Sequence, residues 1–155
     1  MIKKELYFFF FFAVVLIACD KEPIENEPNE IIGDVPYIEL RSVSPTTVTE
    51  YVDSILFEIF YQDGNGDLGY ESPDSMALFI TDARIFTTEQ YHIPMLTPAG
   101  TELTIQGILN VKLDRTIMID DSNPSETVQF KVQIKDRAGN YSNIVTTQDI
   151  TVLPD

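Results

Sequence analysis

The sequence predicts an all-β fold, a single antiparallel β-sandwich that occupies residues 36–155. Apolar and polar residues alternate with a period of two along several segments, as on half-buried strands. No segment shows the sustained 3.6-residue period of an amphipathic helix. Short turns rich in Gly, Asp and Asn separate the alternating segments. Roughly six or seven short strands in about 120 residues is typical of a small sandwich.

The alternation places the strands in chain order. It predicts strands at 37–43, 55–61, 76–80, 103–113, 128–134 and 144–153. The pattern is clearest at 128–134, where even positions are apolar and odd positions polar. Gly107 interrupts the pattern of its strand and predicts a bulge or bend. Residues 84–100 are ambiguous and have room for a short edge strand.

The composition excludes some partners. The chain of 155 residues has 25 acidic and 10 basic side chains, for a net charge of −15. Phosphates repel such a chain, so nucleic-acid binding is not expected. An anionic lipid surface repels it too, so membrane attachment requires a covalent or spanning anchor. A single Cys excludes disulfides within the chain and multi-cysteine metal sites.

The N-terminus has the features of a secretory signal. Lys3 and Lys4 precede an apolar run from Leu6 to Ala18. As a helix, this run would span roughly 20 Å, which is short of a hydrocarbon core of about 30 Å. Residues 1–18 are therefore predicted to be a signal peptide rather than a membrane span.

The boundary of this segment, Leu16-Ile17-Ala18-Cys19, resembles the bacterial lipobox. The resemblance implies cleavage before Cys19, a diacylglycerol group on its thiol and usually an acyl chain on the new amine. The alternative is a buried Cys19 at the end of an uncleaved anchor helix. The abrupt change to polar residues at Asp20 favours cleavage.

Residues 19–35 are predicted to be a lipidated Cys followed by an acidic, flexible tether, because acidic residues and Pro disfavour folding there. The arrangement resembles surface lipoproteins of the Bacteroidota group, which implies an exported, outer-membrane protein. The run Asp20-Lys21-Glu22 loosely resembles their surface-display signal, and an ordinary spacer is the alternative. An Asp beside the lipidated Cys signals inner-membrane retention in other bacteria, so the final leaflet stays open.

The C-terminal part of the chain carries a second resemblance. The segment from Asp136 to Asn143, reading DRAGNYSN, is similar to a turn in immunoglobulin-like and fibronectin-like domains of bacterial surface proteins. This resemblance implies an immunoglobulin-like sandwich for 36–155. The paired Cys and core Trp of antibody domains are missing, which excludes that subtype.

One loop has a candidate metal site. Asp63, Asn65 and Asp67 alternate after the strand at 55–61, and oxygen ligands at such spacing suit Ca²⁺. The spacing resembles the first half of an EF-hand loop, in which glycines let carbonyls turn inward. It departs where Leu68 stands in place of Gly and Asp74 in place of the final Glu. Asp-Gly and Asn-Gly also form turns without metal, so a plain turn is the alternative.

Sandwich topology adds two further candidate ligands. The loop after 55–61 and the turn after 128–134 are expected at the same end of the fold, which places Asp136 and Asn140 near Asp63. Glu71 is a further candidate. Carboxylates crowded there would repel one another without a cation. The alternative is that Asp136 caps its own turn, with Arg137 as counter-ion.

No catalytic constellation is evident. His92 has no second ligand nearby in sequence, and no Ser or Cys nucleophile has an evident base. A glycoside hydrolase would need two carboxylates in a deep cleft, so a non-catalytic protein is predicted. Phe86 and Tyr91 are candidate ligand contacts, with loop packing as the alternative.

Two functions remain. The first is a lipid-anchored envelope protein that acts as a binding or structural module stabilised by Ca²⁺. The second is an accessory glycan- or peptide-binding lipoprotein of an outer-membrane uptake complex. The expected partners are the membrane, through the lipid, and an envelope protein or glycan.

Overall fold

The computed structural model describes residues 32–155, which form strands and loops but no helix. The prediction of an all-β fold is confirmed. Within this part of the chain, no helix is long and apolar enough to cross a membrane. The predicted signal peptide, Cys19 and tether residues 20–31 lie outside the described residues.

The first sheet is antiparallel, with the strand order β1-β3-β6. Its strands are β1 (Tyr37–Ser44), β3 (Ile55–Asp63) and β6 (Ile105–Leu113). In β3 every odd-numbered residue is buried, as the alternation predicted. β3 pairs with β6 without interruption from Ile55↔Leu113 to Asp63↔Ile105.

The second sheet is also antiparallel, with the order β5-β4-β8-β9. Its strands are β4 (Leu78–Asp82), β5 (Thr88–Tyr91), β8 (Phe130–Ile134) and β9 (Val145–Thr146). β5 is the edge strand for which the ambiguous segment 84–100 left room. Leu78 pairs with Ile134 at one end of this sheet, and Asp82 pairs with Phe130 at the other.

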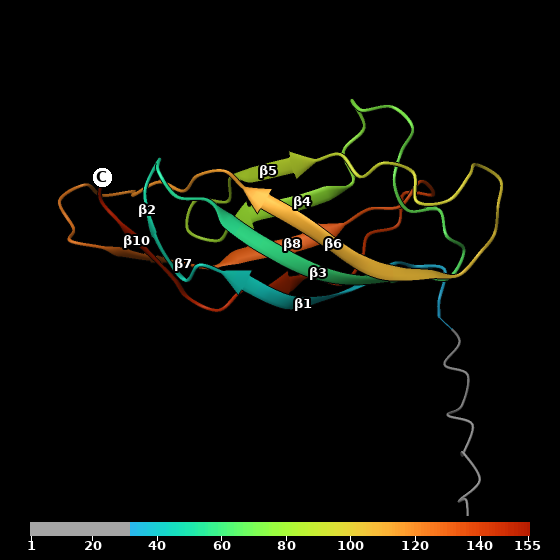
Figure 1. Cartoon of the computed structure of the whole chain (residues 1–155), viewed down its shortest axis with the longest axis horizontal. Helices are drawn as coiled ribbons and strands as arrows, with labels where there is room; N and C mark the ends of the chain where they lie inside the picture. The colour runs from blue at the N-terminus through green and yellow to red at the C-terminus, as the bar shows by residue number, and fades with distance from the viewer. Residues whose placement is uncertain (1–31) are drawn as a thin grey trace, which may run out of the picture. The chain divides into compact units, whose positions relative to one another are not determined.

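The inner faces of these two sheets share one apolar core, as in a sandwich (Figure 1). The ring of Phe57 in β3 meets the ring of Phe130 in β8 edge to face, with centroids 5.9 Å apart. Such pairs add to the burial of the rings themselves. Both sheets contribute large, fully buried side chains: Phe57, Ile38, Ile55, Ile59, Leu78, Ile80, Val132 and Ile134.

A third, small sheet lies at one end, with the order β2-β10-β7. Its strands are β2 (Thr47–Thr49), β10 (Ile150–Leu153) and β7 (Glu126–Val128). β2 was not predicted, and it pairs with β10 in parallel, so the prediction of a purely antiparallel domain is wrong in this sheet.

Two predicted strands are split by this third sheet. The prediction at 128–134 joined β7 to β8, and the prediction at 144–153 joined β9 to β10. At the breaks, Phe130 N–H donates to Thr147 Oγ1 and Thr147 N–H donates to the Phe130 carbonyl. These bonds let both chains change sheets together without leaving backbone groups unpaired.

Gly107 does not form the predicted bulge. It pairs in register with Tyr61, and a Cβ at this position would lie 2.8 Å from Tyr61 Oη. The glycine therefore makes room for the tyrosine ring.

The N-terminal end of the domain is held at two points. The Gly33 carbonyl accepts a hydrogen bond from Gly64 N–H at 2.9 Å, so residues 32–35, assigned to the tether, already contact the domain. Further on, Asn143 accepts from Ile38 N–H and donates to the Ile38 carbonyl. This side chain joins β1 to the turn that follows β8.

Candidate functional site

Two loops meet at the end of the two main sheets where β3 and β8 finish. Leu68 and Asp136 form an isolated antiparallel bridge. Arg137 N–H donates to the Asp67 carbonyl at 3.1 Å, and Ala138 N–H donates to Asp67 Oδ2 at 3.0 Å. The structure thus brings together Asp63, Asp67 and Asp136, as the sandwich topology predicted. We call these three carboxylates the acidic cluster.

Asp63 is the most unusual member of the acidic cluster. Its side chain is fully buried, and neither carboxylate oxygen has a hydrogen-bond partner of normal geometry within residues 32–155. Burial, followed by the negative charges of Asp67 and Asp136, raises the pKa of Asp63 to about 6. The backbone amides of Leu68 and Asn65 oppose this shift. A buried carboxylate in this state is costly unless a proton or a cation neutralises it.

Asp67 and Asp136 differ in how well they are satisfied. Asp67 Oδ1 is buried without a partner in the described part of the chain, and burial raises the pKa of Asp67. Asp136 is fully buried, but it accepts from Asn140 N–H at 2.7 Å and from Asn140 Nδ2 at 2.9 Å. Asp136 therefore caps its own turn, which was the alternative considered from the sequence.

Arg137 is not the counter-ion of Asp136. Its guanidinium donates to the carbonyls of Leu68 at 3.3 Å and Gly69 at 2.9 Å. No ion pair of Arg137 occurs in the described residues. Its role in the structure is to hold the two loops together.

The loop carbonyls are engaged in hydrogen bonds within the fold. Each carbonyl from residue 64 to residue 68 accepts a hydrogen bond from elsewhere in the domain. In loop order, the donors are Thr104 Oγ1, Leu103 N, Thr97 Oγ1, Arg137 N and Leu96 N. Asn65 Oδ1 accepts from Asp67 N–H within the turn.

Of the candidate ligands, Glu71 lies apart from this centre, whereas Asn65 and Asn140 are bonded to members of the acidic cluster. Glu71 is exposed, and it is not among the charges that shift the pKa of Asp63 or Asp67. As the side chains lie, no group of three His, Cys, Asp or Glu residues within 32–155 is placed to hold a metal ion. Three oxygens of Asp63 and Asp67 remain without partners there.

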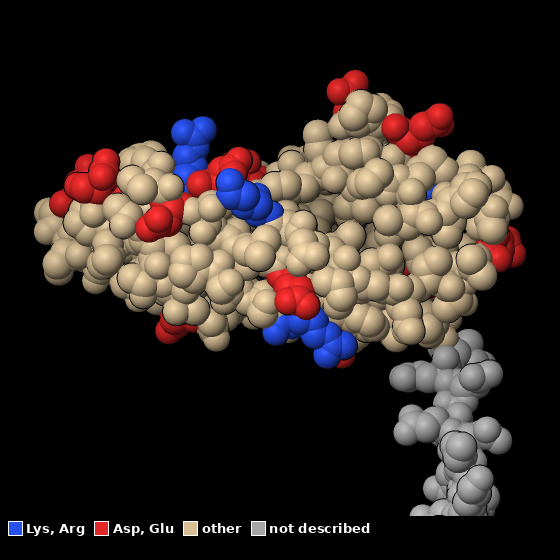
Figure 2. All heavy atoms as spheres, viewed as in Figure 1, with Lys and Arg blue, Asp and Glu red and all other residues tan. Residues whose placement is uncertain are grey.

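Exposed charges show no comparable cluster on the face in Figure 2. Acidic and basic side chains are scattered among uncharged ones on this face. The acidic cluster is set apart because two of its carboxylates, Asp63 and Asp136, are fully buried.

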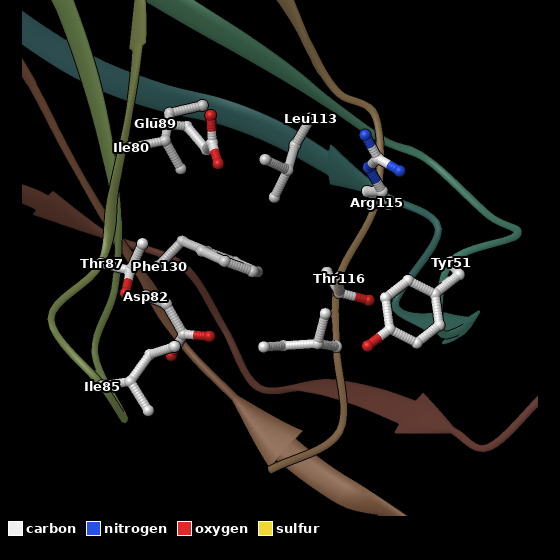
Figure 3. Close-up of a pocket in the computed structure, with 11 residues that line it drawn as sticks. Tyr51, Ile80, Asp82, Ile85, Thr87, Glu89, Leu113, Arg115, Thr116 and Phe130 are labelled. Atoms are coloured by element: carbon white, nitrogen blue, oxygen red, sulfur yellow. The ribbon is translucent and has the colours of Figure 1, made fainter.

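A cavity of about 240 Å³ lies toward the other end of the two main sheets (Figure 3). Its apolar walls include Ile80, Leu113 and Phe130, all buried in the core. Tyr51 and Ile85 border it and are partly exposed. Its remaining lining residues are Asp82, Thr87, Glu89, Arg115, Thr116 and Ile117. The cavity was not predicted from the sequence, because its lining comes from four separate segments.

Buried charges fix the walls of this cavity. Arg84 pairs with Asp82 at 2.6 Å and with Glu126 at 2.7 Å, and it donates to the Ile117 carbonyl at 3.0 Å. Glu50 is buried and accepts from Met118 N–H at 2.9 Å. Asp82 is therefore neutralised by Arg84 and is not free to bind a ligand.

Three other polar groups at the cavity remain available. Thr116 Oγ1 is buried and has no hydrogen-bond partner within residues 32–155. Arg115 and Glu89 are exposed and make neither ion pairs nor side-chain hydrogen bonds in that range. Both also line a second cavity of about 190 Å³, beside Tyr91, Leu113 and Asp114.

Of the two aromatic residues predicted to contact a ligand, only Tyr91 lines one of these two cavities. Tyr91 lines the second cavity, where burial and then the charges of Glu89 and Asp114 raise its pKa to about 12. Phe86 is 75% exposed and lines neither cavity. His92 lies away from both, with Nδ1 2.9 Å from the Ser75 carbonyl, which is a structural contact.

The sequence matches no protein-family model, no curated protein sequence and no solved structure.

Proposed function

We propose that this protein is a lipid-anchored, non-catalytic module of the cell envelope, with an immunoglobulin-like domain that Ca²⁺ stabilises at its acidic end. The single observation that carries the calcium part of this proposal is the fully buried carboxylate of Asp63, whose two oxygens have no hydrogen-bond partner of normal geometry in residues 32–155. The anchor and the envelope location rest on residues 1–35.

The donor chemistry at the acidic cluster suits a hard cation. Ca²⁺ prefers carboxylate oxygens and accepts irregular coordination by six to eight ligands. Asp63 and Asp67 would supply the first ligands, because their oxygens are unpartnered, whereas Asp136 is already engaged by Asn140. The loop carbonyls are used within the fold, so water would have to complete the shell. A weak site of the extracellular type is therefore expected.

The test is thermal unfolding of residues 20–155, made without Cys19, in EDTA and in about 2 mM Ca²⁺. For a dissociation constant of ~0.1 mM, linkage stabilises the folded state by about 1.8 kcal/mol. In a domain of this size the melting temperature should rise by roughly 5 °C. Asp63→Ala should abolish the rise, and Glu71→Ala should leave it intact. Equal melting of the parent domain in EDTA, Mg²⁺ and Ca²⁺ would leave a proton as the only neutralising partner of Asp63.

A second function, ligand binding by an accessory envelope lipoprotein, is favoured by the cavity beside β4 and β5. Its apolar walls are fixed by the Arg84 ion pairs, and polar groups without partners border it. Pre-formed apolar cavities with a few polar groups are typical of ligand sites. The two functions are compatible, because the acidic cluster and the cavity belong to opposite ends of the main sheets.

A further inference from the structure

The mouth of the larger cavity is built from two strained turns. Tyr51 has a φ of 56° and Phe86 a φ of 59°, and no other non-glycine residue from 32 to 155 has a positive φ. Tyr51 borders the cavity, and Phe86 follows Ile85, which borders it from the facing side (Figure 3). Left-handed backbone at bulky residues is unfavourable, and it often occurs at binding sites. Here both turns present apolar side chains that are largely exposed.

The interior of the cavity offers one apolar surface and one orphaned hydroxyl. Ile80, Leu113 and Phe130 are at most 5% exposed, so their packing is set by the core rather than by a ligand. Thr116 Oγ1 is buried and without a partner in the described part of the chain. A buried hydroxyl without a partner costs free energy that a ligand oxygen would recover. An apolar group with an adjacent acceptor would satisfy both features.

The rim carries opposite charges. Arg115 lies two residues after the end of β6 on one side of the cavity, and Glu89 belongs to β5 on the other (Figure 3). Arg115 and Glu89 do not pair with each other. A guanidinium without a partner favours a carboxylate, and a carboxylate without a partner favours an ammonium group. The third acid at the cavity, Asp82, is neutralised by Arg84.

We propose that this cavity binds a zwitterionic ligand with an apolar side chain, either a free apolar amino acid or a short peptide. Its carboxylate contacts Arg115 and Thr116 Oγ1, its ammonium group contacts Glu89, and its side chain packs on Ile80, Leu113 and Phe130. The volume of about 240 Å³ suits a ligand of this size rather than a large glycan. The proposal deepens the ligand-binding function above and is independent of the calcium site.

The test is isothermal titration calorimetry on the full chain in lipid nanodiscs, with empty nanodiscs as the blank and EDTA present throughout. The probes are L-phenylalanine, the dipeptide Ala-Phe, N-acetyl-L-phenylalanine, L-phenylalaninamide and L-alanine. We expect Phe or Ala-Phe to bind with a dissociation constant of ~0.1–1 mM, as small ligands of this kind do. Loss of the ammonium group, the carboxylate or the aromatic side chain should each weaken binding about tenfold. Tighter binding of Phe identifies the free amino acid as the ligand, and tighter binding of Ala-Phe identifies the peptide.

Substitutions at the cavity test each proposed contact with the ligand separately. Arg115→Gln should remove the preference for Phe over its amide, and Glu89→Gln should remove the preference for Phe over its N-acetyl form. Arg41→Gln and Glu102→Gln change exposed charges outside the cavity and should keep both preferences. Thr116→Val should weaken binding roughly three- to tenfold without unfolding the domain. No saturable heat with Phe or Ala-Phe up to about 10 mM would overturn the proposal, as would unchanged preferences in both rim variants.

Discussion

Buried carboxylates at the two ends of the main sheets differ in whether the domain itself neutralises them. Near the cavity, the buried carboxylate of Asp82 is neutralised by Arg84, which also pairs with Glu126 and holds the Ile117 carbonyl. At the acidic cluster, Asp63 is fully buried with no cation from the described chain beside it. The buried charge near the cavity is therefore neutralised within the domain, whereas the buried charge of the acidic cluster depends on a proton or a cation from solution. The charge at the cavity that remains unpaired, on Arg115 and Glu89, is exposed and open to a ligand.

The largest change in stability is expected when the buried ion pair between Arg84 and Asp82 is broken. Arg84→Met removes the guanidinium and leaves Asp82 buried without its partner. Loss of one member of a buried pair is strongly destabilising, so the free energy of unfolding should fall by about 3 kcal/mol. Urea denaturation measures this change. Arg41→Met, which removes an exposed ion pair with Glu39, is the matched control and should cost less than about 1 kcal/mol. Equal losses in both variants would contradict the comparison.

The next effect is the response of the acidic cluster to pH. Because the pKa of Asp63 is raised to about 6 in the folded domain, the folded state holds its proton more tightly than the unfolded state does. Stability is then highest near and below the ordinary Asp pKa and falls as pH rises toward about 6. In EDTA, the domain should lose roughly 1.5 kcal/mol between about pH 5 and pH 7.5 through this group.

Two variants and one ligand sharpen this pH prediction. Asp63→Asn should flatten the decline, because it removes the titrating carboxyl group. Asp74→Asn, at an exposed position with the same change in charge, should retain it. Ca²⁺ should oppose the decline at the higher pH. Urea denaturation at both pH values gives the measurement, and a wild-type stability that rises over this range would contradict the role assigned to Asp63.

The smallest effect concerns Thr116. Its buried hydroxyl has no partner in residues 32–155, so Thr116→Val should stabilise the domain by about 1 kcal/mol while it weakens ligand binding. Thermal unfolding of Thr116→Val beside Thr147→Val provides the comparison. Thr147 Oγ1 accepts from Phe130 N–H, and its loss should destabilise the domain. A destabilised Thr116→Val variant would mean that the hydroxyl already has a stabilising role in the fold.

Much of the strand pattern could be predicted, because a strand with one buried face has alternating apolar and polar residues. β1, β3, β4 and β6 lie close to the predicted ranges, and burial in β3 follows the alternation. The change of sheet at Gln129 could not be predicted in this way. Val128 and Phe130 are both buried on either side of the break, so the alternation continues although the partner strand changes.

The acidic cluster was within reach of the sequence, and the cavity was not. Sandwich topology placed the turn that holds Asp136 beside Asp63. The hydrogen bonds of the loop carbonyls depend largely on residues 96–104, which run from the ambiguous segment 84–100 into the strand predicted at 103–113. The cavity depends on two positive φ angles and on Arg84, an isolated basic residue among acids. Arg84 was the one available signal, since a buried acid needs such a partner.

The attachment of the N-terminal strand has a mechanical consequence. The chain enters the domain at the Gly33–Gly64 hydrogen bond, and β1 then runs antiparallel to β3 from Tyr37↔Gln62 to Ser44↔Leu56. Tension on the entering chain, resisted by a ligand held near Tyr51, would pull β1 along its own axis. The β1–β3 hydrogen bonds would then bear the load together in shear instead of opening one by one. Asn143, bonded to both backbone groups of Ile38, would share that load.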